Sequence, residues 1–270
     1  MTLEPRKGEY LKNGIIFCSK CHTQRSWTSP DGEMTVRCAC KCMSEAYDKS
    51  QEDKQQQERL ARLSELKRNS IIGARYENST FEKLDLDRPI SFQIAKVRCE
   101  NFCKNWEEVK KLGLGMYLFG HDYGTGKTEL TACIRNYLLE RNVMVLVTNF
   151  LEISKRLRKA FATGEETEED IIKKFAEVDL LVIDDIGTEK VIKGENETFM
   201  QERIYDILNR RYSNYKPTIF TSNYSIEELL HDRGLAQKTI DRINEMSSAV
   251  IELEGTSYRL KNLEKQQKVF

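Results

Sequence analysis

The chain has 270 residues, which is enough for one mid-sized domain and a small additional one. Its 43 basic and 43 acidic side chains cancel, so overall charge gives no sign of nucleic-acid binding, and any such contact needs a local patch. No run of about 18 apolar residues occurs and the N-terminus lacks the apolar core of a signal peptide, so we expect a cytosolic protein with no membrane-spanning segment. In the cytosol its eight cysteines stay reduced and can bind metal.

Residues 1–43 contain a cluster of cysteines with the spacing of a metal site. The cluster reads Cys18-x-x-Cys21, then sixteen residues, then Cys38-x-Cys40-x-Cys42. Structural Zn²⁺ takes four thiolate or imidazole ligands in a tetrahedron, and two close groups joined by a loop supply them. We therefore predict a small zinc-binding module over residues 1–43.

This module has more candidate ligands than one tetrahedral site needs. The first pair is expected to bind, Cys40 joins it with either Cys38 or Cys42, and His22 competes for a place. The module also mixes basic side chains and Trp27 with acidic ones, so its composition does not decide between a protein partner and a nucleic acid. The other three cysteines lie in helical patterns and are expected to pack in the core.

Residues 44–70 are rich in charged side chains and glutamine, with Leu60, Leu63 and Leu66 at helical spacing. This pattern is typical of a solvated helix with a thin apolar stripe. We predict that it forms a charged helical linker or a surface for a partner.

The remaining residues, 71–270, have the pattern of a globular α/β domain. Short apolar runs alternate with helical segments, which predicts a parallel sheet with crossover helices. The expected strands are residues 116–119, 143–148, 180–183, 218–221 and 249–253.

The segment after the first of these strands has the form of a phosphate-binding loop. It ends in Gly126-Lys127-Thr128 and runs directly into a helical pattern, the order that such a loop requires. Backbone N–H groups and the positive end of the helix would then face the phosphates. Lys127 would reach the β- and γ-phosphates, and the Thr128 hydroxyl would hold Mg²⁺. The expected nucleotide contacts are Gly120, His121, Tyr123, Gly124, Thr125, Gly126, Lys127, Thr128 and Glu129.

One position departs from the strict G-x-x-x-x-G-K-[ST] pattern. His121 stands where the first glycine belongs, and Gly120 comes one residue too early. Either His121 fills that place or the loop carries one extra residue. The sequence Asn-Lys-x-Asp, a sign of guanine specificity, does not occur, so ATP is the expected nucleotide.

The densest basic stretch follows the second expected strand. On a helix, Lys155, Arg158 and Lys159 share one face, with Phe161 close by. Cations beside an aromatic ring that can stack on a base form the arrangement that single-strand DNA binders use. The alternative is a solvated helix face with Phe161 packed in the core.

Polar side chains end the third and fourth expected strands. Asp184 is expected to coordinate Mg²⁺, directly or through water, and Asp185 to polarise the attacking water. Asn223 would orient that water or touch the γ-phosphate. In isolation such residues are often helix caps or turn formers, and the phosphate loop upstream favours the catalytic interpretation.

These motifs together resemble the AAA+ ATPases, and within them the helicase loaders of the DnaC and DnaI family, with the transposition helper IstB nearby. The resemblance covers about residues 70–262. The segments that carry it are 124–128, 178–187, 221–223, 241–242 and 257–259. It implies an α/β fold, in which a P-loop AAA+ parallel-sheet ATPase domain follows the small zinc-binding domain.

The resemblance also implies roles for two arginines. Arg242 would reach the γ-phosphate of a neighbouring subunit's ATP, so that self-association completes the site, and Arg259 would contact the nucleotide in its own subunit. A guanidinium suits both tasks because it is always charged and offers a planar fork of donors. A surface ion pair is the alternative for either residue.

By resemblance, the protein binds and hydrolyses ATP and loads a replicative helicase hexamer onto single-stranded DNA. In that family the zinc module grips the helicase, and the segment with Arg158 and Phe161 lines the DNA channel. Asp185 stands where many AAA+ enzymes have glutamate, and this shorter side chain implies slow, partner-stimulated hydrolysis. A transposition helper is an alternative against which the zinc module counts. An adaptor that keeps ATP as a structural ligand is another, which the departure at His121 leaves open.

Overall fold

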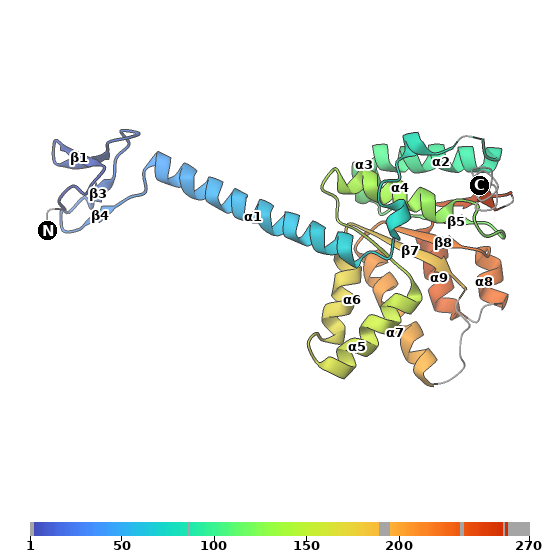
Figure 1. The fold of residues 1–270 in the computed structure, drawn as a ribbon. Helices are drawn as coiled ribbons and strands as arrows, with labels where there is room; N and C mark the ends of the chain where they lie inside the picture. Colours follow the sequence, from blue (N-terminus) through green and yellow to red (C-terminus); the bar gives the residue numbers. More distant parts are fainter. Residues whose placement is uncertain (1–2, 86, 189–194, 233–234, 256, 259–270) are drawn as a thin grey trace. The chain divides into compact units, whose positions relative to one another are not determined.

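The computed structural model describes residues 3–85, 87–188, 195–232, 235–255 and 257–258. The chain divides into two compact units, residues 1–62 and 63–270 (Figure 1). Among the described residues, no helix combines the length and the apolar character needed to cross a bilayer.

The N-terminal unit consists of two short antiparallel hairpins followed by most of a long helix, whose last residues belong to the second unit. Strand β1 (Glu9–Lys12) pairs with β2 (Ile15–Cys18), strand β3 (Ser26–Thr28) pairs with β4 (Thr35–Arg37), and helix α1 spans Lys41–Asn69. Asn13 and Gly14 form the first turn, and both have positive φ, as a tight two-residue hairpin turn requires. The helix is exposed all round from residue 43 to residue 61, in agreement with its charged composition.

The second unit is built around a five-stranded parallel sheet in the order β6-β7-β8-β5-β9. Its strands are β5 (Met116–Phe119), β6 (Val145–Thr148), β7 (Leu180–Ile186), β8 (Thr218–Ser222) and β9 (Ala249–Glu252). The five apolar runs of the sequence therefore form the sheet, and the predicted α/β fold is confirmed. Because these strands are parallel, their carboxyl ends meet at one edge, where ligands bind in open sheets of this kind.

Helices cover both faces of this sheet (Figure 1). The helices are α2 (Ile90–Lys104), α3 (Trp106–Leu112), α4 (Lys127–Leu139), α5 (Phe150–Thr163), α6 (Glu168–Glu177), α7 (Glu195–Ser213), α8 (Ile226–Asp232) and α9 (Gln237–Met246), with short 3-10 turns at Ala74–Tyr76 and Phe81–Lys83. The first three pack on one face and the other five on the opposite face, each with its own cluster of buried apolar side chains. Alternate strand residues supply the two clusters: Tyr117 belongs to one, Met116 and Leu118 to the other.

Strand β7 is longer than the sequence predicts. It extends past Ile183 to Ile186, with an irregular register against β8 between these two residues. Asp185 lies in this irregularity with φ of 61°, a left-handed conformation that is uncommon for residues other than glycine. Such strain is concentrated at functional sites, and here it sets the position of a predicted catalytic carboxylate.

Candidate functional site

The phosphate loop joins β5 to α4, and its conformation accounts for its glycines. Gly124 and Gly126 have φ of 80° and 105°, in the region that favours glycine. A Cβ on Gly126 would also lie 2.5 Å from a ring carbon of Phe92. Helix α4 begins at Lys127, so the first N–H groups of the helix lie at the loop and are available to an anion.

The odd position in this loop, His121, has no glycine-like role in the structure. Its imidazole is largely exposed, with its nitrogens 3.6 Å from a carboxylate oxygen of Glu228 and 3.9 Å from one of Glu252. The close approach occurs one residue earlier, because a Cβ on Gly120 would lie 2.2 Å from the carbonyl oxygen of Leu253. Of the two alternatives, the geometry therefore favours a loop with one extra residue, with Gly120 as its first glycine.

Lys127 and Thr128 connect the loop to the carboxylate strand. The Lys127 ammonium is buried and donates to the carbonyl oxygens of Gly120, at 2.9 Å, and Asp122, at 3.2 Å. The Thr128 hydroxyl donates to the carboxylate of Asp184, with its two oxygens at 3.2 and 3.4 Å. A hydroxyl and a carboxylate at this separation are oxygen ligands of the kind that Mg²⁺ takes beside a nucleotide.

The second carboxylate, Asp185, is held by the next strand. Asn223 donates its amide N–H to the Asp185 carboxylate at 2.9 Å, and the backbone N–H of Asp185 donates to the Thr221 hydroxyl at 2.9 Å. The Thr221 hydroxyl in turn donates to Asp184. Burial raises the pKa of the Asp184 carboxyl, and the hydrogen bonds from Thr221 and Thr128 offset this effect only in part.

These groups line one cavity of about 510 Å³. From the phosphate loop and the strand ends, its walls include residues 123–129, Asp184, Asp185, Thr221 and Asn223. Tyr258, from the segment 257–259, also lines it, and the other lining residues come from outside the predicted motifs: Ile71, Gly73, Arg75, Tyr76 and Arg88. The cavity has the size and mixed lining of a small-molecule site, and it unites most of the predicted nucleotide residues. Gly120, His121 and Arg242 do not line it.

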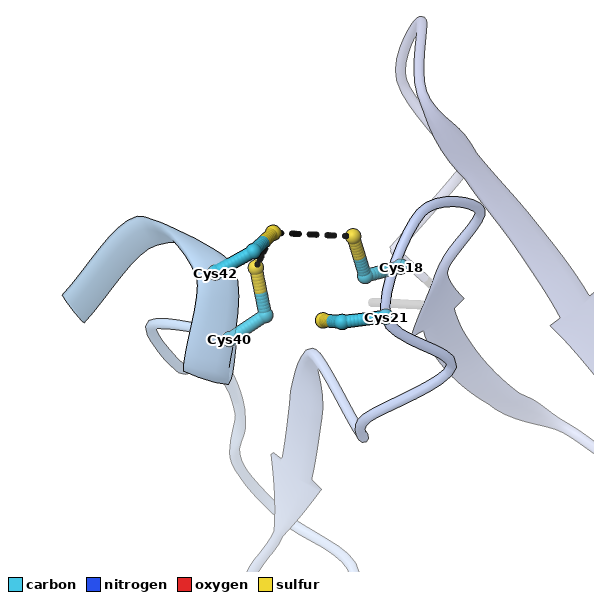
Figure 2. Close-up of side chains that lie close together, drawn as sticks. All are labelled: Cys18, Cys21, Cys40 and Cys42. Atoms are coloured by element: carbon cyan, nitrogen blue, oxygen red, sulfur yellow. Dashed lines mark hydrogen bonds between the residues drawn. The ribbon is translucent and has the colours of Figure 1, made fainter. Parts of the chain in front are cut away.

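In the N-terminal unit, four cysteine thiols meet at one point (Figure 2). The sulfur atoms of Cys18, Cys21, Cys40 and Cys42 all lie within 4.8 Å of one another. Tetrahedral zinc with bonds of about 2.3 Å places its sulfur ligands about 3.8 Å apart, so the four residues fit this ion. Of the two alternatives for the fourth cysteine, the geometry favours Cys42.

The thiols of this group differ in acidity. A hydrogen bond with Thr23 lowers the pKa of Cys21 to about 5, whereas the adjacent Cys40 thiol raises the pKa of Cys42 to about 12. Four thiolates at this separation repel one another, so a bound dication is what would allow all four to lose their protons together. His22 does not belong to the group, and its ring nitrogen lies 3.3 Å from the Tyr10 hydroxyl instead.

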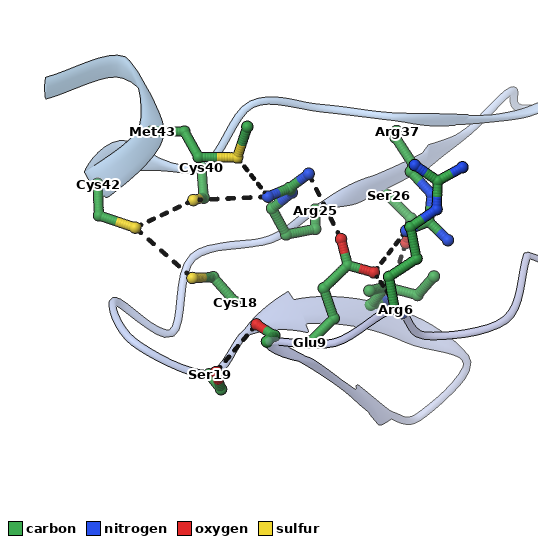
Figure 3. A network of polar contacts seen from close by, with 12 residues as sticks. Arg6, Glu9, Cys18, Ser19, Arg25, Ser26, Arg37, Cys40, Cys42 and Met43 are labelled. Atoms are coloured by element: carbon green, nitrogen blue, oxygen red, sulfur yellow. Dashed lines mark hydrogen bonds and ion pairs between the residues drawn. The ribbon is translucent and has the colours of Figure 1, made fainter. Parts of the chain in front are cut away.

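A network of ionic contacts surrounds the cysteine group (Figure 3). Glu9 is almost fully buried between two guanidinium groups, those of Arg25, at 3.4 Å, and Arg37. Arg25 also donates to the Cys40 sulfur at 3.8 Å. The backbone N–H of Arg6 and the two arginines hold the pKa of Glu9 below its ordinary value. The network thus connects both hairpins to the start of α1 and places a cation beside the thiolates.

The cavity lies in the part of the chain that is similar to known proteins. A model of the family described as IstB-like ATP binding protein matches residues 37–266. The chain belongs to this family. The replicative helicase loader DnaC of Escherichia coli K12 is 29% identical over 180 residues, which is 64% of this chain and 71% of that protein. The replicative helicase loader DnaI of Bacillus subtilis 168 is 28% identical over 186 residues, 69% of this chain and 55% of that protein.

The fold of this IstB-like protein is also that of a solved helicase loader. A crystal structure of the DnaC helicase loader superimposes with a TM-score of 0.57 over 67% of this chain and all of the other, at 24% identity. Five parallel strands between two layers of helices, with the phosphate loop after β5, are therefore a fold that this chain shares with that loader. This confirms the fold class that the sequence motifs predict.

The resemblance assigns roles to two arginines of this IstB-like chain, and the structure describes one of them. Arg242, on α9, pairs with Glu245, and its guanidinium carbon lies 4.3 Å above the ring of Tyr212. It makes a surface ion pair within its own subunit. Arg259 lies outside the described residues. Its neighbour Tyr258 lines the cavity and donates its backbone N–H to the Gly124 carbonyl at 3.0 Å. The residue directly before Arg259 therefore contacts the phosphate loop.

The basic stretch lies on α5 as predicted. Lys155, Arg158 and Lys159 are exposed, while Ile153 and Leu157 face the core. The alternative that places Phe161 in the core is wrong, because this ring is 61% exposed. Exposure follows from helical spacing, since the buried stripe already takes positions 153, 157 and 160 of this helix.

Sequence reasoning missed several residues of the cavity. Thr221 belongs to the segment 221–223 that carries the family resemblance, and its position at the end of a strand could have indicated a role. Arg75, Tyr76 and Arg88 lie far ahead of the phosphate loop in irregular or short helical segments. No pattern in the sequence marks them, because only the fold brings them to the nucleotide side of the sheet.

Proposed function

We propose that this chain is a cytosolic, ATP-dependent DNA replication protein that loads a hexameric replicative helicase onto single-stranded DNA. The observation that carries the proposal is the cavity at the carboxyl ends of β5, β7 and β8, in a chain whose matched relatives bear the name of replicative helicase loader. The further elements of the proposal are the nucleotide chemistry, the subunit contact, the DNA surface and the helicase contact.

For the nucleotide, the residues fit ATP and Mg²⁺. Lys127 would bind the β- and γ-phosphates, and Thr128 with Asp184 would hold Mg²⁺, which neutralises phosphate charge when bound. Asp185 would accept a proton from the attacking water and fix its direction, with Asn223 holding the carboxylate in place. Asp185 lacks one methylene relative to glutamate, so we expect slow hydrolysis that a partner accelerates. Slow hydrolysis of this kind suits a switch that times the release of the helicase.

For the subunit contact, we propose that Arg242 acts on the ATP of a neighbouring copy. Its position supports this, because it does not line the cavity of its own subunit and the donor at its Nε makes no hydrogen bond to any described residue. In a monomer it keeps its charge paired with Glu245. Association would exchange that exposed partner for a phosphate, which is a stronger acceptor. Arg259 is proposed to contact the nucleotide in its own subunit, next to Tyr258.

For the DNA, the exposed face of α5 supports a single-strand contact. Lys155, Arg158 and Lys159 present three cations on one side, and Phe161 offers an exposed ring for a base. Leu151 lies on the same face and is also exposed. Exposed apolar side chains that stand together with cations on one helix face favour a binding surface.

For the zinc module, we propose a protein partner, the helicase itself. Two of the basic residues that nucleic acid would need, Arg25 and Arg37, are paired with the buried Glu9 and are mostly covered. The β3–β4 hairpin instead exposes a strip of apolar side chains. Trp27 lies opposite Val36 across the hairpin, next to Met34, and the three are 47%, 38% and 55% exposed. Such a strip is typical of a protein interface.

The test of this function is the identity of the partner. Tagged full-length chain is incubated with lysate of the organism that encodes it, with a slowly hydrolysed ATP analogue or without nucleotide. We expect recovery of a hexameric replicative helicase that depends on the nucleotide. Recovery of a transposase would replace the loader with the transposition helper, and recovery of neither with either nucleotide state would contradict the proposal.

A further inference from the structure

Arg88 occupies an unusual position beside the phosphate loop. It precedes α2, its side chain is 5% exposed, and it lines the cavity. The guanidinium carbon lies 4.1 Å from the centre of the Phe92 ring and 4.0 Å from that of Tyr258. Contact with two aromatic rings restricts how the guanidinium can turn, and its hydrogen-bond donors point outward within its own plane.

Only part of its donor capacity is used. Nη2 donates to the Glu129 carboxylate at 2.6 Å, whereas the buried Nε and Nη1 have no hydrogen-bond acceptor among the described residues. A buried guanidinium normally satisfies its donors, so donors of this kind point to an acceptor that arrives with a ligand.

The direction of the unused donors is set by Gly126. A Cβ on this glycine would lie 2.7 Å from Nη1 of Arg88, so Nη1 lies directly over the residue that precedes α4. The start of this helix is where the phosphates of a nucleotide are expected to bind. An anion in that place would meet the backbone donors of the loop and the Arg88 guanidinium together.

The Glu129 carboxylate would compete with a bound phosphate for the Arg88 guanidinium. Glu129 directly follows Thr128 of the loop and also lines the cavity, with its carboxylate paired to Arg88. Pairing with the Glu129 carboxylate neutralises part of the charge of the Arg88 guanidinium, so less of its attraction remains for a phosphate. Glu129 therefore weakens phosphate binding through its effect on Arg88.

We infer that Arg88 is a further phosphate ligand of the nucleotide site, acting through Nη1 on the phosphate beside Gly126, and that Glu129 competes with that phosphate for the guanidinium. The inference rests on the proposed nucleotide function of the cavity. Because Tyr258 stacks on Arg88 and bonds to the Gly124 carbonyl, the same contact connects the phosphate loop to the segment that leads to Arg259.

The experiment measures the affinities of the full-length chain for ATP and ADP by calorimetry, and for AMP by displacement of a fluorescent ADP. Arg88→Gln should weaken ATP and ADP about ten- to hundredfold, the loss of a charge-assisted hydrogen bond, with little change for AMP. Glu129→Gln should strengthen ATP and ADP, and this gain should disappear in the double variant because its cause is Arg88. Arg98→Gln, an exposed position on α2, is the matched control and should leave all three affinities unchanged.

Several outcomes would overturn the inference. Equal losses for ATP, ADP and AMP in Arg88→Gln would make Arg88 a packing residue, as would unchanged affinities. A gain from Glu129→Gln that persists without Arg88 would remove the competition. If Arg88→Gln does not fold, Arg88→Lys keeps the charge without the planar fork and should show a smaller loss of the same pattern. Failure of the unmodified chain to bind any of the nucleotides would instead contradict the proposed function of the cavity.

Discussion

The two units of this chain hold their functional groups in place in different ways. In the second unit, two clusters of buried side chains clamp a parallel sheet, and Thr128, Asp184 and Asn223 are already positioned by hydrogen bonds within the protein. In the N-terminal unit the buried apolar residues among those described are Ile16, Cys18 and Cys40, and the last two are candidate metal ligands. So few buried groups rarely stabilise a small fold without a metal or disulfide.

The two sites should therefore respond differently to the loss of their ligands. The nucleotide site should survive loss of its ligand, because packing holds it. The N-terminal unit should not survive loss of the proposed zinc ion, because four sulfur–metal bonds would then be lost and the Glu9 network alone would remain.

The largest effect is expected from loss of the metal. Structural zinc supplies about 10–16 kcal/mol of apparent binding energy in small modules, so a chelator or Cys18→Ser should unfold the N-terminal hairpins. Amide hydrogen exchange should report loss of protection in β1–β4, while ATP affinity and protection of β5–β9 stay unchanged.

A matched control is available in the same cluster. Cys38→Ser should keep one zinc ion bound, because Cys38 is not among the four converging sulfurs. Loss of zinc from Cys38→Ser would contradict the choice of the four ligands. Loss of nucleotide binding in Cys18→Ser would contradict the independence of the two units.

The next largest effect concerns Arg242. If this residue acts on a neighbour's ATP, Arg242→Ala should reduce ATP hydrolysis about a thousandfold while ATP binding persists. The measurement is steady-state hydrolysis beside calorimetric ATP affinity. Mixing Arg242→Ala with Lys127→Ala should restore part of the rate, since each variant supplies what the other lacks. An undiminished rate in Arg242→Ala alone would argue against a contribution between subunits.

Lys127→Ala tests the phosphate loop itself. Removing the ammonium should weaken ATP binding by about a hundredfold or more, because several charge-assisted hydrogen bonds are lost. Thermal unfolding should show that the fold is retained, as expected for a site that packing holds. Retained ATP affinity would remove the phosphate-loop assignment.

The smallest effect is expected on α5. Arg158→Ala combined with Phe161→Ala should weaken single-stranded DNA binding by about 1–3 kcal/mol per lost stacking contact and lower the salt dependence by about one phosphate contact. Fluorescence anisotropy over a series of salt concentrations measures both. Lys173→Ala, an exposed lysine on α6, is the control. Equal changes in the two variants would mean that α5 has no specific role.

Much of this molecule can be predicted from its sequence, because its strands and motifs are patterns of residues that are close together in the chain. The strands are apolar runs with the length of buried parallel strands. Asp184 and Asn223 directly follow such runs, and Lys127 begins the helix that follows the β5 run. Because the strands are parallel, their carboxyl ends lie at one edge of the sheet and bring these three residues together. The position of each residue relative to its strand therefore predicts where it lies in the fold.

The rest depends on contacts that local patterns do not contain. Arg88 reaches the cavity because α2 packs against α4, and Tyr258 because the chain returns from β9 to the loop. The choice of Cys42 over Cys38 depends on the start of α1 at Lys41, which turns Cys42 toward the first pair. The positive φ of Asp185 follows from the irregular pairing of β7 with β8.

We propose that an ATP switch and a separate zinc module act together to place a helicase on DNA. The most direct test of this proposal uses the purified replicative helicase of the same organism and circular single-stranded DNA, and measures the helicase that co-purifies with the DNA. The chain with ATP should increase this amount, Lys127→Ala should lose the increase at the nucleotide step, and Cys18→Ser should lose it because it no longer binds the helicase. An increase that neither variant affects, or no increase with the unmodified chain, would contradict the claim.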